Sequence, residues 1–225
     1  RERAHHVAVA VVEIMRQLGH HRFSIMGHNR GARVAYRLAL DQPDHVARLV
    51  LLDIVSTRDW WLAADRGESA AASHWAFLAQ PAPLPEGLIA RDPSDWLEGR
   101  LKRMTKSRSL AEIDQRALDD YKTAFAQPDR IHATCEDFRA GARCDRSDDE
   151  ADVAAGRRIA CPTLVLWSNA HTAHLRHDLL TLWRPWCEDV RGHAIDGGHY
   201  LAEENPDALL EAVLPFLTPI DGSAA

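Results

Sequence analysis

The sequence lacks several features that would assign it to a specialised class of protein. It has no apolar run long enough to cross a membrane, no signal peptide and no glycine-rich phosphate-binding loop. Its four cysteines have neither zinc-ribbon nor zinc-finger spacing, and they are Cys135, Cys144, Cys161 and Cys187. We therefore expect reduced thiols in a cytoplasmic protein.

An excess of positive charge is also missing. The 225 residues carry 27 Lys and Arg against 33 Asp and Glu, a net charge of −6, and the two signs are interspersed. We therefore expect neither a nucleic-acid partner nor a membrane surface. With 46% hydrophobic residues, the chain is long enough to bury one sizeable core. It starts at Arg1 and enters helical periodicity directly, which predicts the C-terminal part of something longer.

A strand, a sharp turn and a helix are predicted near the start of the chain. The apolar run Phe23 to Met26 meets Gly27, and Gly31 opens a helix-compatible stretch, Ala32 to Leu40. We expect a side chain at either glycine to collide as the backbone doubles back. The residue at the tip is Asn29, the position that holds the nucleophile in a G-x-S-x-G elbow.

Further strands are predicted later in the chain. The apolar run Val46 to Leu52, interrupted only by Arg48, suits a strand buried on both faces of a parallel sheet. Strands are also predicted at Thr163 to Trp167 and near Val190 to Ile195, and helical stretches alternate with them. Such alternation is typical of a doubly wound α/β fold, whose sites lie beyond the carboxyl ends of the strands. A last helix, Asp207 to Leu214, is expected to stop at Pro215.

The strand rhythm is interrupted in the middle of the chain. No convincing strand occurs from about 56 to about 150, where helical stretches and tryptophans dominate. We predict an α/β core in two segments, residues 1–55 and 151–218, separated by an inserted helical cap over 56–150. Residues 219–225 are expected to form a flexible tail.

Three residues follow the order nucleophile, acid, base of an α/β-hydrolase. Asn29 occupies the elbow, Asp53 ends the second strand, and His199 follows a Gly-Gly turn near the C-terminus. A strand-end Asp is often only a helix cap and a single His is often solvated, but the ordered triple favours a catalytic role. His199 is the expected base, with Asp53 fixing its tautomer.

The elbow Gly27-His28-Asn29-Arg30-Gly31-Ala32-Arg33 resembles that of the haloacetate (fluoroacetate) dehalogenases, whose pattern is G-H-D-R-G-A-R. Further blocks match in the same order: Leu51 to Ile54, His74-Trp75, Cys135 to Gly141, and Gly198-His199. The resemblance implies a partial α/β-hydrolase, the C-terminal part of the sheet with an inserted helical cap. The N-terminal strands of the family and its H-G turn have no counterpart here.

The resemblance also implies a cofactor-free mechanism. A carboxylate at the elbow displaces halide from carbon, and water activated at the His199 position hydrolyses the resulting ester. Asn29 replaces that carboxylate with a poor nucleophile, so we expect the first step to be impaired unless Asn29 deamidates. Arg30 and Arg33 are expected to face one substrate carboxylate together, and the backbone N–H of Arg30 is a candidate oxyanion donor.

Three cap positions correspond to the halide-binding residues of that family. His74 and Trp75 are the implied donors, and Phe138 stands where the family has a tyrosine, so one donor is lost. Fluoride accepts hydrogen bonds most strongly, so its release should suffer most. We therefore expect an Asn29→Asp form to favour chloroacetate or bromoacetate.

Two other functions remain open from the sequence. An epoxide hydrolase shares the ester chemistry but requires paired cap tyrosines, and only Tyr121 lies in the predicted cap. The second alternative is a catalytically inactive protein that binds small carboxylates. The resemblance implies a homodimer and a small haloacid as the substrate. We expect no metal, because His171 and His174 lack a carboxylate or cysteine at a telling interval and are interpreted as surface histidines.

Overall fold

The computed structural model describes residues 4–65, 72–171 and 178–218. Its centre is a four-stranded parallel sheet in the order β1-β2-β3-β4. The strands are β1 (Phe23–His28), β2 (Val46–Leu52), β3 (Thr163–Ser168) and β4 (Val190–Ile195). The alternation of predicted strands and helices therefore gave the correct fold class, and the bounds of β2 and β4 match the predicted ones.

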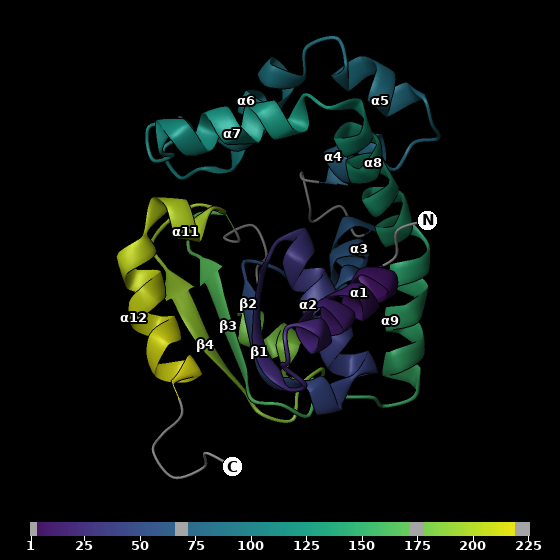
Figure 1. The fold of residues 1–225 in the computed structure, drawn as a ribbon, viewed down its shortest axis with the longest axis vertical. Helices are drawn as coiled ribbons and strands as arrows, with labels where there is room; N and C mark the ends of the chain where they lie inside the picture. The colour runs from purple at the N-terminus through teal and green to yellow at the C-terminus, as the bar shows by residue number, and fades with distance from the viewer. Residues whose placement is uncertain (1–3, 66–71, 172–177, 219–225) are drawn as a thin grey trace.

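Helices cover both faces of the sheet (Figure 1). Helices α1 (Ala4–Gln17), α2 (Arg30–Asp41) and α10 (Leu179–Trp183) lie on one face, and α11 (Leu201–Glu204) and α12 (Pro206–Leu217) lie on the other. A short 3-10 helix, η1 (Pro43–His45), leads into β2. Successive strand residues point to opposite faces, so Leu49 packs against α2 and Val50 against α12.

Between β2 and β3, the described residues form seven inserted helices. They are α3 (Thr57–Asp65), α4 (Ala72–Leu78), α5 (Leu84–Ile89), α6 (Pro93–Met104), α7 (Gln115–Phe125), α8 (Pro128–Ala142) and α9 (Cys144–Ala154). Helices α4 to α8 form an upper layer above the sheet, whereas α9 descends beside α2 and α3 (Figure 1). The described residues from 57 to 154 contain no strand.

One predicted helix end was wrong. Helix α12 runs through Pro215 to Leu217 instead of stopping before it. Proline removes one backbone donor, and Pro215 lies close to the end of the helix at Leu217, so only a short segment continues beyond it. The side chain of Phe216 is 2% exposed against the sheet, which secures that turn. The predicted tail, 219–225, lies outside the described residues.

The described part of the chain contains no helix that is both long enough and apolar enough to cross a membrane. All four cysteines are free thiols, as predicted, and only Cys144 is not buried.

Candidate active site

The turn between β1 and α2 has the sharpness that its glycines predicted. Asn29 stands between the two elements with φ 50° and ψ −118°, and α2 begins at the next residue. A Cβ at Gly27 would lie 2.5 Å from the carbonyl oxygen of Gly31, so only glycine fits there. The same expectation for Gly31 was wrong, because a Cβ at Gly31 would meet open space.

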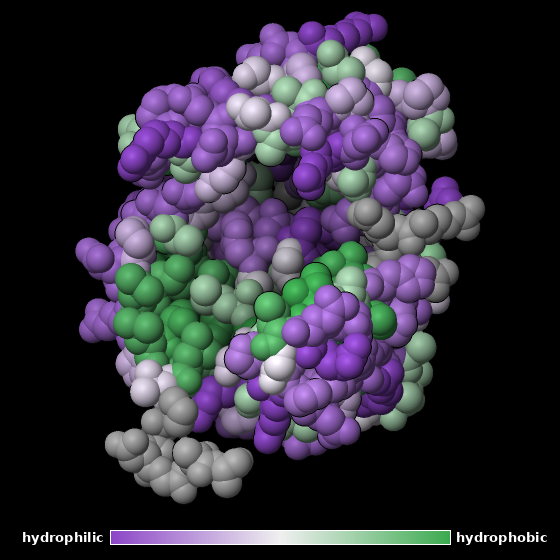
Figure 2. Space-filling view, viewed as in Figure 1, coloured by the Kyte–Doolittle hydropathy of each residue, from purple (hydrophilic) through white to green (hydrophobic). Residues whose placement is uncertain are grey.

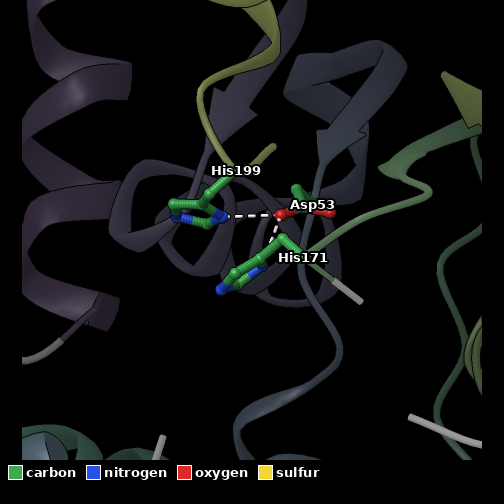
Figure 3. Close-up of side chains that lie close together, drawn as sticks. All are labelled: Asp53, His171 and His199. Atoms are coloured by element: carbon green, nitrogen blue, oxygen red, sulfur yellow. Dashed lines mark hydrogen bonds and ion pairs between the residues drawn. The ribbon is translucent and has the colours of Figure 1, made fainter. Parts of the chain in front are cut away.

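Asp53 follows β2 and holds two histidines. It has a positive φ of 53°, and its Oδ1 accepts a hydrogen bond from the backbone N–H of Ser168 at 2.8 Å. Its Oδ2 lies 2.6 Å from Nδ1 of His199 and 2.8 Å from Nδ1 of His171 (Figure 3). Burial opposes ionisation, but the hydrogen bonds from the two histidines outweigh it and hold the pKa of Asp53 well below its usual value.

His199 lies in a loop that packs tightly against the end of α6. Its backbone N–H donates to the carbonyl of Met104 at 2.9 Å, and a Cβ at Gly198 would lie 2.6 Å from that same carbonyl oxygen. Burial lowers the pKa of His199 to about 4, although Asp53 opposes the shift. The ring is therefore neutral at neutral pH. Its Nε2 is buried without a hydrogen-bond partner, so it can accept a proton from water.

Two histidines beside His199 were missed by the sequence reasoning. The interpretation of His171 as a surface histidine was wrong, since it bonds Asp53 and contacts the ring of His199 in a tilted arrangement with 4.5 Å between ring centroids. His174 lies outside the described residues. His28 is 2.8 Å from the carbonyl oxygen of His199 through Nε2. A signal for His171 existed, because it follows the end of β3, and sites in this fold lie beyond the carboxyl ends of the strands.

Asp53, His171 and His199 form the one group of potential metal ligands found among the described residues. Their ligand atoms lie within 4.8 Å of one another. However, the oxygen–nitrogen distances of 2.6 and 2.8 Å are those of hydrogen bonds in which both rings donate to Asp53. As arranged, the group orients His199 for proton transfer.

A cavity of about 470 Å³ lies between the upper helical layer and the sheet. Figure 2 shows the molecule hollowed there, with hydrophilic surface inside the hollow. The cavity is lined by every predicted site residue except Arg30. Sequence positions as distant as Asn29, Phe138 and His199 therefore share one space.

The two predicted carboxylate-binding arginines have different partners. Arg33 is 2% exposed and donates from Nη1 to the carbonyl of Val55 at 3.2 Å and to the hydroxyl of Thr57 at 3.0 Å. Burial and the charge of Arg30 lower the pKa of Arg33 to about 10, so it stays cationic at neutral pH. Its guanidinium lies 4.7 Å from the ring centroid of Trp75.

Arg30 does not line the cavity, although its guanidinium lies 5.1 Å from the ring centroid of Trp75. Its Nε and Nη2 donate to the carboxylate of Asp137 on α8, with the Nη2 bond at 2.9 Å. Arg30 Nη2 also lies 3.7 Å from Asp145 on α9. The expectation that both arginines face one ligand therefore differs from the structure, because the α8 carboxylate already occupies the fork of Arg30.

The three predicted halide-binding positions lie together on the cavity wall. Phe138 makes edge contacts with His74 and Trp75 at centroid distances of 5.7 and 5.0 Å. Trp60, which the sequence reasoning did not select, stacks on Trp75 at 4.1 Å. Tyr121 does not line the cavity, and its hydroxyl donates to Glu203 instead.

Comparison with known proteins finds one matching family and several related sequences. The family described as alpha/beta hydrolase fold matches residues 1–206. A fluoroacetate dehalogenase from Burkholderia sp. is 36% identical over 206 residues, which cover 92% of this chain and 67% of the relative. A soluble epoxide hydrolase from Corynebacterium sp. (strain C12) is 25% identical, covering 95% of this chain and 73% of that protein.

Solved structures show the same fold. A provisionally assigned α/β hydrolase from Nostoc sp. PCC 7120 has a TM-score of 0.91 at 41% identity, covering 96% of this chain and 73% of that one. A mutant of a provisionally assigned epoxide hydrolase from Pseudomonas aeruginosa, with bound MFA, has a TM-score of 0.90 at 44% identity, covering 96% and 72%. These similarities include proteins named for two different reactions.

Proposed function

The chain belongs to the α/β-hydrolase fold family, and from that premise we propose that it has the site of a hydrolase that cleaves the carbon–halogen bond of short 2-haloacids. One observation carries the proposal. Arg33, a buried cation, lines the same cavity as Asn29 and the Asp53–His199 pair. A guanidinium in that setting suits the carboxylate of a haloacid, and the dehalogenase from Burkholderia sp. supports the same reading.

The proposed reaction requires a carboxylate at position 29. One of its oxygens attacks the halogen-bearing carbon, an ester bond forms, and the halide leaves with the electron pair of the broken bond. His74 and Trp75 are suited to donate hydrogen bonds to that halide. His199 Nε2 then takes a proton from water, whose oxygen attacks the ester carbonyl carbon. The bond between that carbon and the substrate oxygen breaks, and His199 returns its proton to the departing alkoxide, which leaves as a 2-hydroxyacid. The regenerated acid at position 29 loses its proton to solvent and is again a carboxylate.

Asn29 blocks the first of these steps. Its amide oxygen is a weak nucleophile, and its NH2 group donates where the reaction needs an acceptor. The chain as written is therefore expected to bind a haloacid without turning it over.

Halide release from chloroacetate tests the proposal. We expect release by the Asn29→Asp variant and none by the unmodified chain, whose intact mass must show that Asn29 has not deamidated. Arg33→Gln in the Asn29→Asp background should raise KM, because the carboxylate contact is lost. Full turnover by unmodified Asn29 protein would contradict the proposal.

An epoxide hydrolase is the second candidate, and Tyr200 is the observation in its favour. This tyrosine lines the cavity, and burial raises its pKa to about 12, so it keeps the proton that an opening epoxide oxygen needs. The relatives named epoxide hydrolases add support. Hydrolysis of styrene oxide by the Asn29→Asp variant, with no halide release from chloroacetate, would favour this candidate.

A further inference from the structure

The cavity has a charge opposite to that of the chain. Although the net charge of the protein is −6, five lining residues are cationic and one, Asp53, is anionic. The cations are Arg33, Arg100, Arg103, Lys106 and Arg108. The single carboxylate already accepts hydrogen bonds from two histidines. One substrate carboxylate bound by Arg33 would leave most of this positive charge without a counterion.

Arg100 differs from the other cations of the upper layer. Lys106 is engaged by Asp196, with Nζ–Oδ distances of 2.6 and 2.7 Å, and Arg103 and Arg108 are exposed. Arg100 is half-buried, and its Nη2 donates to the sulfur of Met104 at 3.2 Å, a weak acceptor. Within the described ranges, no carboxylate oxygen forms an ion pair with Arg100.

Arg100 is therefore a half-buried cation that lacks an anionic partner within the described ranges. Removing a guanidinium from water costs free energy unless an anion or strong acceptor replaces the water. Burial lowers the pKa of Arg100, and the like charge of Arg103 adds to that effect. The nearby Tyr200 supplies no negative charge, because burial raises the pKa of its hydroxyl to about 12 and keeps it protonated. A ligand anion would supply the missing charge.

The size and arrangement of the cavity fit a ligand longer than a haloacetate. Its volume of about 470 Å³ falls among pockets of about 300–1,000 Å³ that bind drug-sized ligands. Arg33 comes from α2 below, whereas Arg100 comes from α6 in the upper layer (Figure 1). The two arginines therefore approach the cavity from opposite layers.

We propose that Arg100 is a second anion-binding residue and that the site takes short dicarboxylates, with one carboxylate on Arg33 and the other on Arg100. In the reaction proposed above, the substrate is then a 2-halodicarboxylic acid. Cleavage of such a substrate rests on the proposed function. Dicarboxylate binding does not depend on that function, because binding needs no chemistry at Asn29.

Matched pairs of acids test the second anion site directly in the unmodified chain. Succinate and butyrate have equal chain length and differ by one carboxylate, as do glutarate and valerate. Binding is followed by calorimetry and by the fluorescence of Trp60, Trp75 and Trp96, which line the cavity. We expect the better dicarboxylate to bind about tenfold more tightly than its monocarboxylate partner, as one charge-assisted hydrogen bond provides.

Arg100→Gln should abolish this advantage while monocarboxylate binding persists, and Arg100→Lys should retain part of it. Arg116→Gln is the charge-matched control, because Arg116 has a side chain that is 94% exposed and lies outside the cavity. Equal binding of each acid pair, or an advantage that survives Arg100→Gln, would overturn the inference. Halide release from chloroacetate by Asn29→Asp without any dicarboxylate preference would overturn this inference alone and leave the proposed function intact.

Discussion

Asp53 Oδ2 accepts hydrogen bonds from two imidazoles, and this arrangement sets the protonation of the site. His199 donates through Nδ1, which leaves Nε2 with a lone pair directed away from Asp53. His171 competes for the same oxygen, and its ring contacts that of His199 in a tilted arrangement. The proton affinity of His199 therefore depends on both neighbours as well as on burial.

We predict opposite pKa shifts from the two neighbours of His199. Asp53→Asn removes the negative charge that raises the pKa of His199, so this pKa should fall further below about 4. His171→Gln removes an imidazole that lowers the pKa of His199, and it leaves His199 as the only imidazole that bonds Asp53 Oδ2 within the described residues. The pKa of His199 should therefore rise. Titration of the imidazole Cε1–H signals by NMR measures both. Shifts of the same sign in the two variants would refute this arrangement.

Phe138 leads to a prediction about halide preference. Phe138 is 8% exposed and contacts both His74 and Trp75. A hydroxyl on its ring would therefore lie beside the two side chains that are proposed to bind the halide. In the Asn29→Asp background, Phe138→Tyr should raise fluoroacetate turnover about tenfold, because a hydrogen bond to a charged acceptor is gained. Chloroacetate turnover should rise less. Ion-selective electrodes measure both halides, and equal gains would argue against the assignment.

At the scale of elements, α9 is joined to α2 by buried ion pairs. Asp152 is 4% exposed and accepts hydrogen bonds from Arg37 on α2 and from Arg157. Arg37 also lies 3.8 Å from Asp149. These contacts connect the inserted helices to the helix that follows the elbow, so they support the floor of the cavity.

Removing one partner from this buried network should be costly. Asp152→Ala leaves Arg37 with less compensation and is expected to lower the free energy of unfolding by about 3–5 kcal/mol. The exposed pair of Asp65 and Arg146 is the matched control, and Asp65→Ala should cost less than about 1 kcal/mol. Urea unfolding measures both variants. A loss below about 1 kcal/mol for Asp152→Ala would contradict the structural role of α9.

The elements also show where sequence reasoning succeeds. A nearly continuous apolar run predicted β2 to the residue, since a strand buried on both faces leaves a strong signal. The bounds of β4 also match, although only Ile195 of that strand is buried. The end of α12 was misplaced because burial of Phe216 outweighs the local effect of Pro215. Helix propensity describes an isolated helix, whereas in the folded protein the packing of side chains against the sheet determines where the helix ends.

At the scale of the whole molecule, the sequence predicted the central residues of the cavity better than it predicted the full set of side chains that line it. The order of Asn29, Asp53 and His199 can be inferred because each follows the end of a parallel strand. The contribution of Arg100 depends on how α6 lies over the sheet, and the pairing of Arg30 depends on the approach of α8. Neither packing arrangement leaves a periodic signal in the sequence.

Stability against pH combines two buried groups with opposite effects. The folded-state pKa of His199, about 4, lies below its unfolded value of about 6.5, so its contribution to stability is present above pH 6.5 and is lost as pH falls toward 4. Burial raises the pKa of Asp149 to about 6 from an unfolded value of about 3.9, so its contribution is lost as pH rises from 4 to 6.

Single substitutions should separate these two effects. Relative to the unmodified chain, His199→Gln should become more stable as pH falls from 6.5 to 4, and Asp149→Asn should become more stable as pH rises from 4 to 6. Urea unfolding at several pH values between 4 and 7.5 measures both trends. Parallel trends in the two variants would show that the two groups are not buried as described.

The central claim is that position 29 is where the substrate becomes attached, and mass spectrometry of the Asn29→Asp/His199→Ala variant with chloroacetate tests it most directly. Without the base, the ester should form and persist, adding one carboxymethyl group to the intact chain, and peptide mapping should locate it at residue 29. The unmodified chain should remain unlabelled. An adduct at another residue, or no adduct while chloride is released, would contradict the account.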